Sequence, residues 1–271
     1  MTTRTIRRLT LSLAVLATLS FAGSAGAAST APTSPTNSPA PTPTKTAPSS
    51  ASVVKELNTT LKDASQRHWV NTDLVLSSQG VTEIAEKLVF GPASATGTIN
   101  VVTSSGPVLL NITILNAAQQ IYVETSPAGL AEFFADLSAA QDTQYANQWL
   151  ELTPSDPDYS SLSPGASSTT VISSLHLSGH LVAGPPTHVD GQRVIPITGK
   201  LSGAKATLYV TDTLRPLPVE IKMSVSGVAA TEVFSQWGEG SLPIAPATAI
   251  PFPTASTTTT LPTTSTTTTL P

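Results

Sequence analysis

The chain has 271 residues, no cysteine and a formal net charge of −4. Without cysteine there are no disulfides, thiolate metal sites or cysteine nucleophiles, so a hydrophobic core must stabilise any folded part. All seventeen acidic residues but only nine of the thirteen basic ones lie in residues 53–240, and this net charge of −8 disfavours binding to nucleic acid or to anionic lipid headgroups.

Residues 1–27 have the three parts of a secretory signal peptide. Three arginines precede a mostly apolar run from Leu9 to Phe21, and Ala25-Gly26-Ala27 is a small-residue pattern after which signal peptidase cuts. The run is shorter than the ~20 apolar residues of a membrane span. A lipid-anchored product would need a cysteine at the cleavage site. The sequence therefore predicts a secreted or cell-wall-associated protein with no transmembrane anchor after cleavage.

Two low-complexity segments flank the centre of the chain. Residues 28–52 are almost entirely Ala, Pro, Ser and Thr, and residues 241–271 carry no charge and contain TTTTLP twice. Neither segment has enough apolar surface to offset its ordering entropy, so both are predicted to be disordered, as a linker and a tail. The stretch LPTTS at 261–265 resembles a sortase signal, but it lacks the glycine and the apolar stretch of that signal, and plain spacing sequence is favoured.

The remaining residues, 53–240, are predicted to form one folded domain. Val53, Leu57 and Leu61 recur at helical spacing and predict a first helix. A period of two then predicts strands at about 68–77, 81–90, 95–104, 107–115 and 119–124.

The middle of the domain is predicted to be helical, with a helix at about 127–141 and a shorter one some thirty residues later. The apolar faces of these helices are formed by Leu130, Phe133, Phe134, Leu137, Val171, Ile172 and Leu175. Strands resume at about 178–184, 186–190, 192–199, 205–212, 217–226 and 228–236. Because strands and helices segregate along the chain, the predicted fold class is α+β: a curved antiparallel half-barrel sheet of about 10–11 strands with a few helices on its concave face.

Several stretches of the domain resemble the actinobacterial LppX/LprG family: VDGQRV before a strand, an LYV…LPV hairpin, and FSQWGEG at a strand end. The resemblance implies a LolA-like fold with a hydrophobic pocket between sheet and helices. Members bind acylated lipids or lipoglycans and help to move them across the cell envelope, in some cases alongside an efflux-type transporter. Most members are lipoproteins, and this chain departs from them because it lacks the cysteine.

A lipid carrier of this kind needs an apolar cavity and no catalytic group, cofactor or metal. The strand residues predicted to line the cavity are Val108, Leu110, Ile112, Ile114, Val219, Ile221 and Met223, together with the seven helical residues named above. The helix at 127–141 is the candidate lid. For each residue the alternative is plain hydrophobic core.

Catalytic and metal motifs are weak in this sequence. Ser202-Gly203-Ala204-Lys205 matches S-x-x-K without the partner motifs of penicillin-recognising enzymes, and Asp156 and Asp158 flank a proline in a turn. His176 and His180 have helical spacing near His188, but Gly179 breaks such a helix. No enzyme is predicted. The alternative to a lipid carrier is a ligand-free cell-envelope interaction or sensing module of the same fold.

Overall fold

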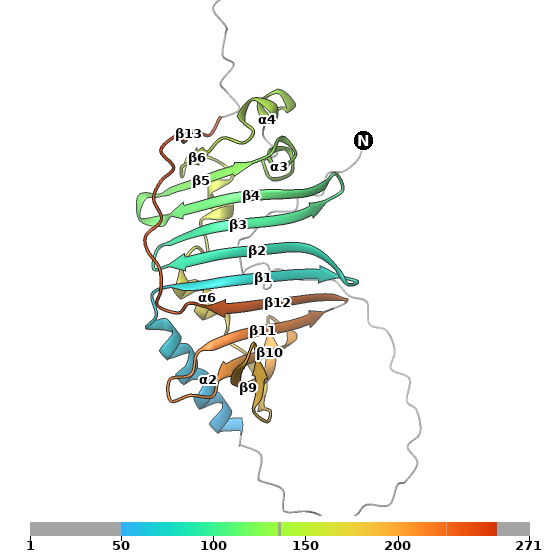
Figure 1. The fold of residues 1–271 in the computed structure, drawn as a ribbon, viewed down its shortest axis with the longest axis vertical. Coiled ribbons are helices and arrows are strands. Elements are labelled where there is room, and N and C mark those ends of the chain that lie inside the picture. The colour runs from blue at the N-terminus through green and yellow to red at the C-terminus, as the bar shows by residue number, and fades with distance from the viewer. Residues whose placement is uncertain (1–49, 135–136, 226, 254–271) are drawn as a thin grey trace, which may run out of the picture.

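The computed structural model describes residues 50–134, 137–225 and 227–253, in which thirteen strands form one sheet. The predicted signal peptide, residues 28–49 of the predicted linker and residues 254–271 of the predicted tail lie outside the described residues. Figure 1 shows the strands stacked from β13 to β9, with α3 and α4 beside one end of the stack and α2 beside the other.

The strands follow the predicted alternation closely along the chain. They are β1 (Val70–Ser78), β2 (Val81–Gly91), β3 (Ser94–Thr103), β4 (Gly106–Leu115), β5 (Gln120–Thr125), β6 (Leu150–Leu152), β7 (Ser178–Ala183), β8 (Thr187–Val189), β9 (Gln192–Leu201), β10 (Ala204–Thr211), β11 (Pro218–Val225), β12 (Val228–Ser235) and β13 (Ile250–Pro251). The helices are α2 (Ser50–Ser65), η1 (Asn116–Ala118), α3 (Pro127–Phe133), α4 (Ala139–Tyr145), α5 (Tyr159–Leu162) and α6 (Ser168–Ser174).

The sheet has the order β13-β6-β5-β4-β3-β2-β1-β12-β11-β10-β9-β7, and β8 also pairs with β9. All pairs are antiparallel except β6 with β13. β1 lies near the middle, between β2 and β12, so the two halves of the chain extend the sheet in opposite directions. The predicted α+β class with one large antiparallel sheet is confirmed.

The C-terminal segment 241–253 returns to the sheet, where the sequence predicted the start of a disordered tail. The backbone N–H of Phe252 donates to the carbonyl of Glu151 at 2.8 Å, next to the β6–β13 pairing. The Phe252 side chain is buried, and its ring centroid lies 5.2 Å from that of Phe134. Phe252, together with the partly buried Ile250, thus supplies apolar surface that holds this segment on the core.

We expect Phe252→Ala to lower the free energy of unfolding by about 3 kcal/mol, because it removes a buried aromatic ring and leaves a cavity beside Phe134. Urea denaturation measures the loss. The matched control is Ile244→Ala, in the same segment, because the Ile244 side chain is 88% exposed. Equal losses for the two variants would show that the segment does not anchor through its phenylalanine.

The predicted single helix at 127–141 is wrong, because α3 and α4 are two helices. The Phe134 N–H closes α3 on the carbonyl of Leu130, and α4 starts at a new cap. The Gln141 N–H donates to Ser138 Oγ at 3.3 Å, and the Ser138 N–H donates to Gln141 Oε1 at 2.9 Å. This S-x-x-Q capping box is a helix-start signal readable in the sequence.

Candidate functional site

The predicted lining residues lie in the interior of the domain. Twelve of the fourteen are buried, with 6% or less of their surface exposed, and the other two, Phe133 and Leu137, pack against the core from partly buried positions. The strand members share one face of the sheet, called here the inner face. Burial of this kind is common to a packed core and to a closed lipid-binding cavity.

Short helices cover the inner face in separate pieces. α3 contacts β4 and β5, α6 contacts β2 and α2, and α2 contacts β7 and β11. The fit of α3 is close because Gly129 has no side chain: a Cβ there would lie 2.8 Å from Val108 Cγ1. Ser168 Oγ at the start of α6 donates to the carbonyl of His68 at 3.0 Å. Apart from α2, each helix in the described ranges has seven residues or fewer.

Three polar side chains interrupt the inner face near the middle of the sheet. The register pairs Leu74 of β1 with Glu86 on one side and with Glu232 on the other, so the three side chains form a row on one face. Thr72 precedes Leu74 by two residues and shares its face. Thr72, Glu86 and Glu232 are called here the inner polar cluster, and at most 4% of each is exposed.

The electrostatics of Glu232 are those of an acid in apolar surroundings. Its carboxyl oxygens accept no hydrogen bond from any residue that the structure describes, and the same holds for the Thr72 hydroxyl. Burial raises the pKa of Glu232 well above its ordinary value, and the neighbouring charge of Glu86 raises this pKa further. The interior therefore favours the neutral acid, which can donate one hydrogen bond.

The residues of the inner polar cluster were not among the predicted site residues, although the sequence pattern that reveals them is readable. Glu232 alternates with Ala230 and Phe234, and Glu86 alternates with Leu88 and Phe90, all of which are buried. A period-two pattern with glutamate among its apolar positions predicts a buried carboxyl.

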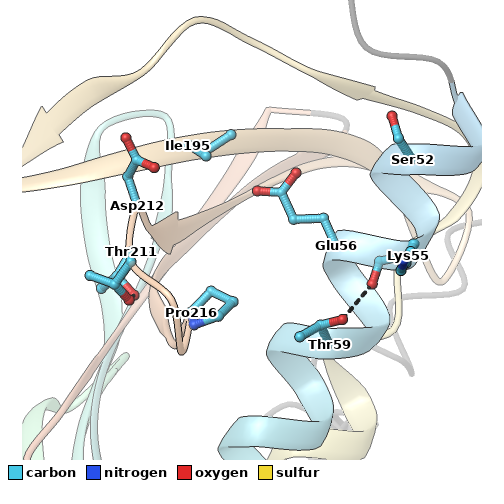
Figure 2. Close-up of a pocket in the computed structure, with 9 residues that line it drawn as sticks. Ser52, Lys55, Glu56, Thr59, Ile195, Thr211, Asp212 and Pro216 are labelled. Carbon is cyan, nitrogen blue, oxygen red and sulfur yellow. Dashed lines mark hydrogen bonds between the residues drawn. The ribbon is translucent and has the colours of Figure 1, made fainter.

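A pocket of about 260 Å³ opens between α2 and the segment from β10 to β11. Its lining residues are Ser52, Lys55, Glu56, Thr59, Ile195, Thr211, Asp212, Thr213 and Pro216, none of which was predicted. Figure 2 shows Glu56 reaching into the pocket from α2, with Asp212 on the opposite wall. Arg193 Nε pairs with Asp212 at 2.9 Å, and partial burial together with the Asp212 charge raises the pKa of Glu56. The polar lining does not suit an acyl chain.

The weak motifs lie in ordinary structural positions. Ser202 is in the two-residue turn between β9 and β10, and His180 and His188 are exposed on edge strands. Asp156 accepts a hydrogen bond from the Thr153 N–H at 2.7 Å and so orders a loop. Within the described ranges, no three His, Cys, Asp or Glu side chains are grouped to hold a metal ion. The helices of those ranges are also too short or too polar to cross a membrane.

The sequence matches no protein-family model and no curated protein. Among solved structures, LprF from Mycobacterium bovis is similar at 13% identity with a TM-score of 0.50, and the match covers 73% of this chain and 99% of LprF. The lipoprotein LppX from Mycobacterium tuberculosis matches at 14% identity and a TM-score of 0.44, over 70% of this chain and 97% of LppX. The likeness to LprF shows a shared overall fold.

Proposed function

We propose that the chain is an LppX/LprG-like envelope protein that carries an acylated lipid or lipoglycan between the inner face of its sheet and the covering helices. The observation that carries this proposal is the mostly apolar inner face, which runs from β9 to β6 and is covered by short, separate helices. The fold shared with LprF and the family resemblance of the sequence support it.

Apolar burial alone is sufficient to bind such a ligand. Each methylene of an acyl chain gains about 0.8 kcal/mol on leaving water, and no catalytic group is needed. Helices of seven residues are not stable in isolation, so α3 and α6 are held mainly by their packing contacts. An acyl chain that replaces those contacts could displace a helix at modest cost.

The proposed mode of transport follows from the predicted export signal. Without an N-terminal lipid, a secreted or wall-associated carrier ferries its cargo and does not hold it at one membrane site. The partner class implied by the resemblance is an envelope transporter. A ligand-free interaction or sensing module is the second candidate, and the burial of twelve of the fourteen predicted lining residues is the observation that favours it.

Native mass spectrometry of the full chain, expressed with its own N-terminal segment in an actinobacterial host, tests the proposal. We expect a mass excess that extracts into organic solvent as acylated lipid. Ile112→Trp should lower the loaded fraction severalfold, because it adds volume to the inner face on β4, the strand that α3 contacts.

The matched control is Leu109→Trp. Leu109 lies on the outer face of the same strand, and its side chain is 50% exposed. Circular dichroism checks that both variants fold. A bare polypeptide mass that stays unchanged after incubation with envelope lipids would contradict the carrier and favour the interaction module.

A further inference from the structure

Lipid-chain burial does not explain the inner polar cluster. Thr72 and Glu232 belong to the neighbouring strands β1 and β12, both are more than nine-tenths buried, and neither side chain is hydrogen-bonded within the described residues. Burying an acid and a hydroxyl without hydrogen-bond partners destabilises a fold. A bound ligand with polar atoms at this depth would satisfy both.

We propose that the inner polar cluster binds the ester-linked centre of a two-chain lipid, with Glu232 and Thr72 donating hydrogen bonds to its ester oxygens. This inference rests on the proposed function and adds to it the chemical class of the cargo.

The position of the cluster within the sheet favours a lipid with two chains. β2, β1 and β12 lie at the middle of the strand order, and at least four further strands extend on each side. At about 4.8 Å per strand, roughly 19 Å of inner face is available in either direction. When the cluster binds the centre of such a lipid, one acyl chain fits between the sheet and α3, and the other fits between the sheet and α2.

The electrostatics favour an uncharged oxygen over a cation. A neutral carboxylic acid donates a hydrogen bond, and an ester carbonyl accepts one without needing a charge. Binding an ammonium group would require the acid to ionise and both charges to leave water, which is costly in an apolar interior. Burial and the adjacent Glu86 both oppose that ionisation.

The test compares three probe lipids: dioleoylglycerol, its diether analogue with the same chains, and oleylamine. Each is titrated against the full chain and followed by native mass spectrometry. We expect the wild type to bind the diester about tenfold more tightly than the diether, which corresponds to one hydrogen bond. Glu232→Leu should abolish this preference, and Glu232→Gln, whose amide can still donate, should keep most of it.

Glu220→Leu is the matched control, because Glu220 is also buried but pairs with Lys222 on the opposite face of the neighbouring strand β11. Equal binding of diester and diether by the wild type would overturn this inference and leave the carrier function standing. Oleylamine binding that is lost in Glu232→Leu, without any preference for the diester, would overturn it in favour of a cation site. If the wild type binds none of the three probes, the inference falls together with the proposed function.

Discussion

Glu232→Gln is expected to stabilise the protein above about pH 5, by an amount that grows with pH. Burial raises the pKa of Glu232 above the 4.5 of a free glutamate. At a pH between 4.5 and this raised pKa, the protein takes up a proton when it folds. The stability contributed by the neutral acid is fully present below pH 4.5 and is lost as the pH rises toward the folded-state pKa. The glutamine variant has no such loss, so its advantage should grow by about 1.4 kcal/mol per pH unit in that window.

Urea denaturation of both proteins between pH 4 and pH 8 measures this difference. Glu86 is the charged side chain that faces Glu232 on the inner face, whereas Lys222 and Glu220 lie on the other face of β11. Glu220→Gln is the control, because it removes a carboxyl that already has a partner, Lys222 Nζ at 2.6 Å. A difference between wild type and Glu232→Gln that is constant over the whole range would mean that Glu232 is solvated in solution.

The same measurement bears on the bound lipid. A ligand oxygen that accepts from Glu232 further favours the protonated form, so the lipid-loaded protein should lose less stability as the pH rises than the lipid-free protein does. If the proposed lipid binds, Glu232 destabilises the free protein and favours the loaded one. This asymmetry is expected of a residue that serves binding, and not of one that serves folding.

Much of the fold follows from periodicity. The eleven predicted strand runs correspond to β1–β5 and β7–β12, because alternation is strong wherever one face is buried, as in the Val219, Ile221 and Met223 series of β11. β6 and β13, of three and two residues, were missed. β8 is equally short, but the Asp190-Gly191 turn joins it to the longer alternating run of β9, and neither β6 nor β13 has such a neighbour in the sequence. Their pairing is a tertiary effect, with Phe252 anchored on Phe134.

The sequence predicted apolar lining residues but not the inner polar cluster. Alternation identifies Leu110 and Ile112 as inward-facing, but it cannot show which strand lies beside which. Glu86 and Glu232 lie 146 positions apart in the sequence, and they share a row only because β2 and β12 both pair with β1. The pocket beside Glu56 was missed for the same reason, since it joins a helix to a distant hairpin.

Gly97→Ala is expected to lower the free energy of unfolding by about 4 kcal/mol, because two penalties combine at this position in the middle of β3. The φ of Gly97 is +149°, which costs an alanine about 1–2 kcal/mol. A Cβ would also overlap the carbonyl oxygen of Lys87 and come within 3.0 Å of Leu88 Cα. Both are backbone atoms of β2 that cannot rotate away, so overpacking adds about 1–3 kcal/mol.

Gly191→Ala separates the two penalties. Gly191 has a φ of +77° in the turn before β9, and a Cβ there would meet no atom within 4 Å, so only the backbone strain of about 1–2 kcal/mol applies. Urea denaturation of both variants should therefore show the larger loss for Gly97→Ala. Equal losses would mean that β2 and β3 can move apart at this point. Because Glu86 lies on β2 close to this contact, such freedom would also loosen the inner polar cluster, and the diester preference of a folded Gly97→Ala protein would fall with it.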